Sequence, residues 1–178
     1  RVHTRVFREE RERPVFLLLD QRREMFFGSR RTLKSVQAVH AAALLAWATL
    51  AAGDRIGGLV IGEHGQHEVR PRRDHRAVLE LLRSCHKFNH RLGIPSAAQA
   101  AAPLAPALAA LRRIVRPGSL VIAISDFSGW DAASSRELHL LARHAESCAI
   151  HVYDVLEHEL PPVGTAPASD GLRRVVID

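Results

Sequence analysis

Short apolar runs alternate with longer helical patterns along this chain. The runs have the length and the Val, Ile and Leu content of buried strands, and they cover 15–19, 55–62, 120–125, 148–155 and 172–177. Helical patterns cover 33–52, 75–88, about 103–115 and a stretch that begins at Asp131 or Ser134 and ends near Ala145. Strands that alternate with helices predict an α/β fold, with helices on both faces of a mostly parallel sheet.

One strand differs from the rest. The run "QHEVRPR" over 66–72 alternates polar and apolar residues and contains Pro71, which suits an edge strand. A tight connection through His64 and Gly65 makes it the hairpin partner of 55–62. Within 55–62, Gly57 and Gly58 indicate a close approach of neighbouring backbone.

Length and composition are those of a globular domain. The 178 residues, 47% of them hydrophobic, predict a single domain over 1–178, with a charged lead-in over 1–13 and a C-terminal loop and final strand over 156–178. Aromatic residues are only 5%, so aliphatic side chains must fill the core. Trp47, in an Ala-rich helix, is expected to be part of that core.

Several function classes are disfavoured. No apolar run reaches the roughly 20 residues of a membrane helix, and no signal peptide is present, so we expect a cytoplasmic domain without membrane contact. A membrane segment upstream of Arg1 in a longer protein is left open. The formal charge of +6 lies largely in mixed runs, and no nucleic-acid-binding motif is found. Cys85 with His86 and His90 is interpreted as a helix end with surface histidines, without zinc.

Two predicted strands end in an acid. Asp20 follows 15–19, and Asp126 follows 120–125. In open α/β sheets, ligands bind beyond the carboxyl ends of strands where the strand order reverses. If the two strands are neighbours, both carboxylates face one crevice. The alternative is that each Asp only caps the turn that follows it.

Four stretches together resemble the family called domain of unknown function 58, a bacterial branch of the von Willebrand factor A-like domains. They are "FREERERPVFLLLDQRREMFFGS", "KSVQAVHAAALLAWATLAAGDRIGGLVIG", "RPGSLVIAISDF" and "HVYDVLEHELP", in the family's order and over nearly the whole chain. The resemblance implies a Rossmann-like three-layer fold, with a mostly parallel six-stranded sheet and one antiparallel edge strand.

Von Willebrand A-like domains typically carry a metal-ion-dependent adhesion site, built from D-x-S-x-S after the first strand, a Thr from a middle loop and an Asp after the fourth strand. Asp20 and Asp126 match the two acids. Arg22 and Glu24 stand where the pattern has serines. The stretch "SAAQAAAPLAPAL", where the Thr should fall, offers only the side-chain oxygens of Ser96 and Gln99.

These departures predict a degenerate adhesion site, made of Asp20, Arg22, Glu24 and Asp126. An Arg cannot be deprotonated to make room for a divalent ion. We therefore expect that Arg22 or Arg23 neutralises Asp20, Asp126 or both, and that no cofactor is bound. The alternative keeps Mg²⁺, with Asp20, Glu24 and Asp126 as its ligands.

The resemblance implies a non-enzymatic protein-interaction module, because relatives are often encoded beside MoxR-type AAA+ ATPases thought to act in protein assembly or maturation. The expected partner is such an ATPase or its client. Contacts are expected from Arg23, Ser29, Arg30, Ser128 and Trp130, although core packing of Trp130 is the stronger interpretation. Arg22, Arg23, Arg30 and Arg31 make this edge basic and favour an acidic partner. A magnesium-dependent adhesion module and, with less support, a metal-dependent hydrolase are the alternatives.

Overall fold

A five-stranded mixed sheet forms the centre of the protein. The computed structural model describes residues 12–63, 65–90, 102–159, 166–169 and 174–177. The strands lie in the order β3-β2-β1-β4-β5; their bounds are β1 (Pro14–Gln21), β2 (Arg55–Gly62), β3 (Gly65–Arg72), β4 (Leu120–Ser125) and β5 (Glu146–His151). All neighbours run parallel except β3, which pairs antiparallel with β2. This confirms the predicted α/β class and its antiparallel edge strand.

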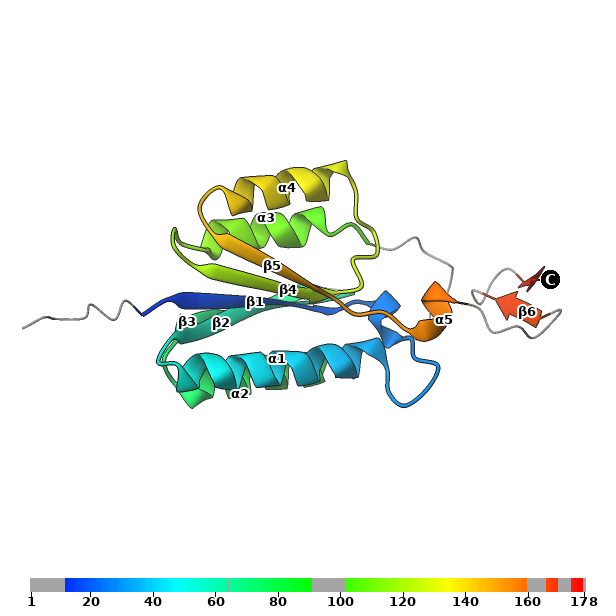
Figure 1. Ribbon diagram of the computed structural model, residues 1–178, viewed down its shortest axis with the longest axis horizontal. Coiled ribbons are helices and arrows are strands. Elements are labelled where there is room, and N and C mark those ends of the chain that lie inside the picture. Colours follow the sequence, from blue (N-terminus) through cyan, green and yellow to red (C-terminus); the bar gives the residue numbers. More distant parts are fainter. Residues whose placement is uncertain (1–11, 64, 91–101, 160–165, 170–173, 178) are drawn as a thin grey trace, which may run out of the picture.

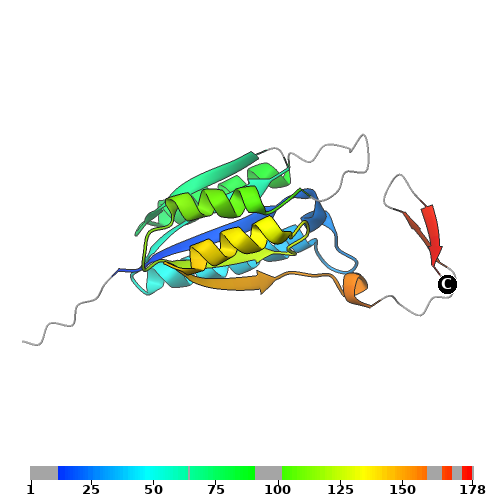
Figure 2. The ribbon, with the colours of Figure 1, turned by 90° about the horizontal axis from the view of Figure 1, so that it is seen from above.

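Helices cover both faces of this sheet (Figure 1). They are the 3-10 helix η1 (Arg23–Phe26), α1 (Lys34–Ala51), α2 (His75–Asn89), α3 (Ala105–Ile114), α4 (Ala132–Ala142) and the short α5 (Val155–His158). Helices α1 and α2 lie on one face, and α3 and α4 lie side by side on the other (Figure 2). Asp74 is the N-cap of α2, and of the two predicted starts of α4, Asp131 and Ser134, Asp131 is the N-cap. None of these helices has both the length and the apolar character that crossing a bilayer requires.

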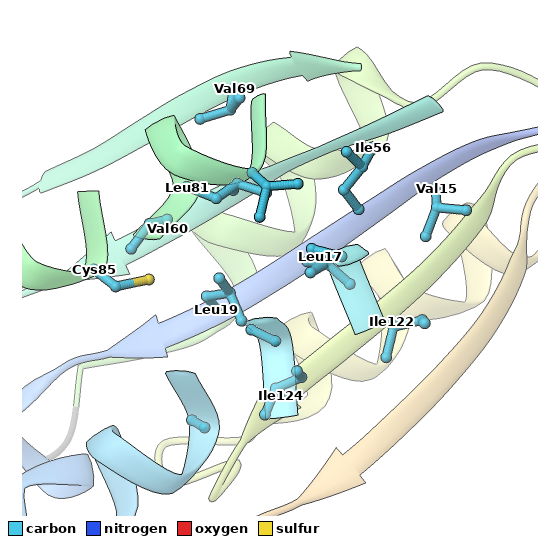
Figure 3. Packing of buried hydrophobic residues seen from close by; sticks show 14 of the residues in the cluster. Val15, Leu17, Leu19, Ile56, Val60, Val69, Leu81, Cys85, Ile122 and Ile124 are labelled. Carbon is cyan, nitrogen blue, oxygen red and sulfur yellow. The ribbon is translucent and has the colours of Figure 1, made fainter. Parts of the chain in front are cut away.

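Strand β1 is buried on both sides. Val15, Leu17 and Leu19 point toward α1 and α2, where they pack with residues such as Ile122 and Ile124 of β4 (Figure 3). Phe16 and Leu18 point to the opposite face, in the core beneath α3 and α4. Because a strand in this position must be apolar on both faces, "VFLLL" is a continuous hydrophobic run. This packing fixes the carboxyl end of β1, where Asp20 lies.

Two glycines allow strands to approach closely. A Cβ on Gly58 would lie 2.3 Å from the carbonyl oxygen of Leu17, and one on Gly57 would lie 2.5 Å from that of Val69. Both distances are shorter than van der Waals contact, so a larger residue at either position would push neighbouring strands apart. The close backbone approach predicted for this pair is confirmed.

The sixth strand predicted for the main sheet is not part of it. Strand β7 (Arg174–Ile177) instead pairs antiparallel with β6 (Ala166–Ser169) in a separate two-stranded sheet. The apolar run correctly indicated a strand, but propensity does not specify a pairing partner, and a partner nearby in sequence needs the smallest loop-closure entropy. The stretch predicted as a loop thus contains β6, and α5 follows β5 where strand was predicted to continue through 155.

The prediction that Trp47 lies in the core is wrong. Trp47 is 46% exposed, and Leu44, one turn earlier on α1, is 74% exposed. Helix α1 is apolar around most of its circumference, so its sequence does not distinguish the face that meets the sheet. Trp130 is also 39% exposed, which contradicts the core interpretation and favours the interpretation of a surface contact residue.

Candidate functional site

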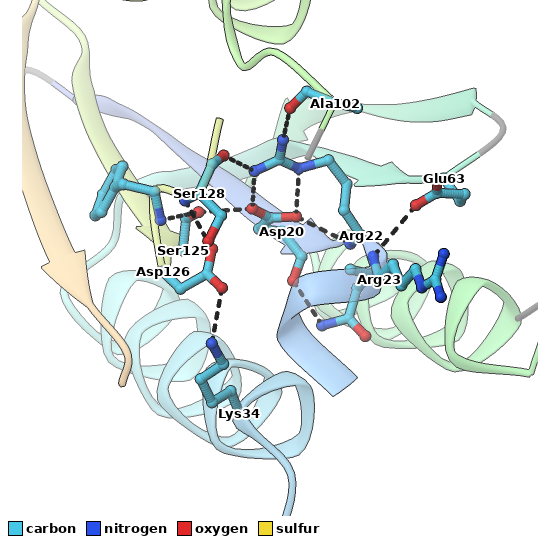
Figure 4. Close-up of polar contacts among 11 residues, drawn as sticks. Asp20, Arg22, Arg23, Lys34, Glu63, Ala102, Ser125, Asp126 and Ser128 are labelled. Atoms are coloured by element: carbon cyan, nitrogen blue, oxygen red, sulfur yellow. Dashed lines mark hydrogen bonds and ion pairs between the residues drawn. The ribbon is translucent and has the colours of Figure 1, made fainter. Parts of the chain in front are cut away.

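The two acids predicted to share a crevice lie at the ends of neighbouring strands. Strands β1 and β4 run parallel, with Leu19 opposite Ile124. Strand β1 is followed in the chain by β2 on its other side, so the strand order reverses between β1 and β4. Ligands of open α/β sheets bind at such a position. Asp20, Ser125 and Asp126 all lie there (Figure 4).

Asp20 is completely buried, and hydrogen bonds occupy both of its carboxylate oxygens. Oδ1 accepts from the backbone N–H of Arg22 at 2.9 Å and from its Nε at 3.0 Å. Oδ2 accepts from Arg22 Nη2 at 2.7 Å and from the hydroxyl of Ser125 at 2.6 Å. A buried carboxylate is stable only when it is paired and hydrogen-bonded in this way.

The guanidinium of Arg22 connects three segments of the chain. Besides Asp20, it donates from Nη2 to the carbonyl of Ser128 at 3.0 Å and from Nη1 to the carbonyl of Ala102. Arg22 is only 3% exposed. Burial lowers its pKa, but the hydrogen bond and charge of Asp20 outweigh burial and raise the pKa above its ordinary value. The cation of this site is therefore a permanent part of the chain.

Of the two candidate arginines, Arg22 and Arg23, only Arg22 forms an ion pair with Asp20 or Asp126 among the described residues. The backbone N–H of Arg23 donates to Glu63 at 3.3 Å, and in the described part of the chain its side chain forms no ion pair with Asp20 or Asp126. The difference follows from strand geometry, because residues i and i+2 of an extended chain point to the same side. Asp20 and Arg22 have that spacing.

This arrangement does not fit a magnesium ion. Mg²⁺ needs accessible oxygen ligands in octahedral geometry, whereas both oxygens of Asp20 are occupied and a guanidinium lies between the segments that would coordinate the ion. Among the described residues, no three His, Cys, Asp or Glu side chains are grouped as a metal site. Glu24 lies on η1, and one of its carboxylate oxygens is buried without a hydrogen-bond partner among the residues that the structure describes. Ser96 and Gln99 lie outside the described residues.

Asp126 pairs with a lysine that the sequence did not indicate. Nζ of Lys34, at the start of α1, lies 2.8 Å from Asp126 Oδ2 and 2.5 Å from Glu157 Oε1 of α5. Burial lowers the pKa of Lys34, but its hydrogen bonds to Asp126 and Glu157 raise it above the ordinary value overall. Burial raises the pKa of Asp126, but Lys34 and the backbone N–H of Ser128 lower it overall. Each acid of the crevice therefore has its own internal cation.

The loop between η1 and α1 is fixed to α5. The backbone N–H of Ser29 donates to Asp154 Oδ2 at 2.8 Å, and the Ser29 hydroxyl donates to Oδ1. These hydrogen bonds hold the pKa of Asp154 below its ordinary value. Asp154 is also the N-cap of α5, where it forms a capping box with Glu157. Ser29 is exposed as a predicted contact residue should be, but its hydroxyl already has a partner.

Exposed apolar side chains gather at this carboxyl edge. Phe27 is 42%, Trp130 39% and Tyr153 55% exposed, and Val155 and Leu156 of α5 are exposed as well. The indole N–H of Trp130 donates to Ser135 Oγ at 2.9 Å, and its ring meets Phe127 edge to face, with centroids 5.9 Å apart. An exposed Trp held in one orientation loses little conformational entropy on binding, which is typical of contact residues.

The remaining predicted contact residues differ in how far they are exposed to solvent. Arg30 is exposed, like the adjacent Arg31, and Arg23 is partly exposed. Ser128 is partly exposed, but its backbone is occupied on both sides, by Asp126 Oδ1 at 3.0 Å and by Arg22 Nη2. Exposed arginines and exposed aromatic rings therefore both occur at this edge.

The sequence matches the family described as "Protein of unknown function DUF58" over residues 1–176. The chain belongs to this family. Uncharacterized protein Rv1480 of Mycobacterium tuberculosis (strain H37Rv) and uncharacterized protein Mb1516 of Mycobacterium bovis are each 31% identical to this DUF58 chain over 178 residues. The alignments cover 98% of the chain and 53% of each relative. The chain therefore spans about half the length of these proteins.

Two solved structures share the α/β fold of this DUF58 chain. BatB from Bacteroides thetaiotaomicron matches with a TM-score of 0.56 and 14% identity, over 78% of this chain and 66% of that one. An aerotolerance-related membrane protein from Bacteroides fragilis matches with a TM-score of 0.55 and 15% identity, over 93% and 81%. Identities this low show a common fold only.

Proposed function

We propose that this DUF58 chain is a non-enzymatic protein-interaction module that binds its partner without a metal ion. The observation that carries the proposal is the buried Arg22–Asp20 pair. In a metal-dependent adhesion site, the ion offers an open position to an acidic group of the partner. Here a guanidinium with four hydrogen bonds occupies that region, so recognition has to come from the surrounding surface.

The composition of the carboxyl edge supports this function. Exposed Trp, Tyr and Phe beside exposed arginines are the residue types enriched at the centres of protein interfaces. Arg30 and Arg31 project from the loop that Ser29 fixes to α5, and they favour an acidic partner surface. Arg22 was expected to contribute to this basic character, but its charge is buried and paired, so the basic surface consists of the remaining arginines.

We further propose that the partner is a MoxR-type AAA+ ATPase or its client, in cytoplasmic assembly or maturation of other proteins. Membership of the DUF58 family supports this partnership, because relatives are often encoded beside such ATPases. Because the chain covers about half of its mycobacterial relatives, the proposed partnership is limited to the region that this chain represents.

A binding measurement with the MoxR-type ATPase of the same organism tests the proposal. Without nucleotide, we expect the same affinity in EDTA and in Mg²⁺. Arg30→Glu/Arg31→Glu should weaken binding by about tenfold or more, because reversing two interface charges costs more than 1.4 kcal/mol. Arg113→Glu/Arg116→Glu, at the opposite edge of the sheet, is the matched control. Binding that requires Mg²⁺, or that both double variants reduce equally, would overturn the proposed surface.

The hydrogen bonds of Asp20 oppose the two alternatives. A magnesium-dependent adhesion module or a metal-dependent hydrolase would need Asp20 as a free ligand, and both its oxygens accept hydrogen bonds from Arg22 or Ser125.

A further inference from the structure

Helix α5 is attached to the protein by polar contacts. Residues 155–158 form a single turn in which no residue is buried. Among the described residues, its polar connections to the rest of the carboxyl edge are the Glu157–Lys34 ion pair and the hydrogen bonds from Ser29 to its N-cap, Asp154. An element that buries no apolar side chain contributes little packing energy, so it opens at a small cost in free energy. Helix α5 can therefore be displaced without breaking apolar packing.

Beneath this helix lies a polar cavity of about 650 Å³, a size typical of binding pockets. It is lined by Lys34, Asp126, Ser128 and Glu157, together with the side chains of His151, Tyr153 and His158. Lys34 is 3% exposed, whereas the side chain of Glu157 is 38% exposed. The buried ammonium thus has one buried partner, Asp126, and one partner at the surface, Glu157.

We propose that Lys34 is a binding site for a carboxylate of an acidic partner segment, and that Glu157 occupies this site in the free protein. A partner carboxylate that replaces Glu157 leaves the charge balance around Lys34 unchanged, so the exchange requires no additional buried charge. The exposed arginines Arg30 and Arg31 increase the local concentration of acidic segments. This inference rests on the proposed interaction function and identifies the contact that would anchor the partner.

The accessibility of Lys34 can be measured directly by chemical labelling, because Lys34 and Lys87 are the only lysines of the chain. Reductive methylation with ¹³C-formaldehyde labels accessible amines, and each dimethyl-lysine gives its own NMR signal. Lys87 is exposed on α2 and serves as the internal reference. In the wild type we expect the Lys87 signal and almost none from Lys34.

The deciding variant is Glu157→Gln, which keeps the shape of the side chain and removes its charge. Methylation of Lys34 should accelerate by about tenfold, because a protected group reacts in proportion to its open population. A capped hexaglutamate peptide should then protect Lys34 and leave Lys87 unaffected, whereas a capped hexaglutamine peptide should protect neither. Glu159→Gln removes an equal charge two residues away and should behave as the wild type. Ser29→Ala, which weakens the second attachment of α5, should expose Lys34 to a smaller extent.

Three results would overturn the inference: an unreactive Lys34 in both Glu157→Gln and Ser29→Ala, an equal effect of Glu159→Gln, or a reactive Lys34 that hexaglutamate does not protect. The ATPase experiment separates this outcome from the proposed function. If the ATPase binds through Arg30 and Arg31 but Glu157→Gln leaves the affinity for the ATPase unchanged, Lys34 is not the anchoring site. The proposed interaction function then still stands. If hexaglutamate protects Lys34 from methylation but the ATPase does not bind the protein, the proposed ATPase partnership is wrong.

Discussion

The guanidinium of Arg22 lies against both carboxylate oxygens of Asp20, with Nε 3.0 Å from Oδ1 and Nη2 2.7 Å from Oδ2. Both side chains are almost fully buried. The cation that a von Willebrand A-like site would take from solution is therefore supplied by the residue two positions after the acid. The two charges depend on each other, because neither has another partner of opposite charge within hydrogen-bonding distance among the described residues.

Arg22→Ser should be strongly destabilising. It leaves Asp20 buried without its cation, and the loss of one partner of a buried ion pair costs about 3–5 kcal/mol. Urea unfolding measures the loss, and Arg23→Ser, which removes a neighbouring charge outside the pair, should change the unfolding free energy by less than about 0.5 kcal/mol. Asp20→Asn/Arg22→Met, without either charge, should recover much of the stability. Equal midpoints for Arg22→Ser and the wild type would disprove the role of the pair.

The wild-type protein should be indifferent to divalent cations. A ligand that binds only the native state stabilises it by RT ln(1 + [L]/Kd), so a working site would raise the melting temperature at millimolar concentrations. Parallel melts in EDTA, Mg²⁺, Mn²⁺ and Ca²⁺ should give the same melting temperature. In Arg22→Ser, the released carboxylate of Asp20 is expected to give a small stabilisation by Mg²⁺. A clear shift in the wild type would restore the metal-dependent alternative, and Glu24 would then be the first residue to substitute.

The sequence predicted the parts of this site that depend on local pattern. Buried runs that end in Asp20 and Asp126 indicated two strands whose acids would share a crevice if the strands were neighbours. The departures at Arg22 and Glu24 indicated a changed site. The sequence also contained the information that Arg22, and not Arg23, pairs with Asp20, because only Arg22 has the i, i+2 spacing that places two side chains on the same side of an extended chain. Ser125 was not predicted as a site residue, since its role depends on which residue of β4 lies beside Asp20.

Lys34 and Glu157 could not be placed from sequence, because their contact joins segments more than a hundred residues apart. Each nevertheless had a local signal. Lys34 lies in the first turn of α1, where a cation is unfavourable to the helix dipole and no acidic residue compensates it. The pattern Asp154-x-x-Glu157 is a capping box and would have indicated α5. The pairing of β7 with β6 had no comparable signal.

Ser125 and Ser128 allow a matched comparison of two serines in one loop. The hydroxyl of Ser125 donates to Asp20 and accepts from the backbone N–H of Phe127 at 2.8 Å. Ser128 forms its hydrogen bonds to Arg22 and Asp126 through its backbone, and its partly exposed side chain also helps to lower the pKa of Asp126. Ser125→Ala removes a buried hydrogen bond to a charged group and should cost about 1.5–3 kcal/mol of unfolding free energy. Ser128→Ala should cost less than about 1 kcal/mol, because its side chain is partly exposed and its backbone hydrogen bonds remain, and equal effects of the two substitutions would contradict the assigned role of Ser125.

The Lys34–Asp126 pair should make stability depend on pH at both extremes. The pKa of Asp126 is lower in the folded protein than its ordinary value of 3.8, so its contribution is complete above that pH and is lost as pH falls through the folded pKa. The pKa of Lys34 is raised above 10.5, so its contribution is complete below that pH and is lost as pH rises through the folded pKa. Between these limits the pair is fully formed.

Urea unfolding of Asp126→Asn at a series of pH values tests the acidic limb. The variant should be less stable than the wild type at about pH 7, and the difference should shrink steadily below about pH 4, where protonation removes the wild-type advantage. Glu68→Gln is the control, because Glu68 is exposed on the edge strand β3 and its side chain forms no hydrogen bond or ion pair with other described residues. Its unfolding free energy should follow that of the wild type throughout. A constant difference between Asp126→Asn and the wild type down to about pH 2.5 would mean that the charge of Asp126 contributes nothing, and that Lys34 is held by Glu157 alone.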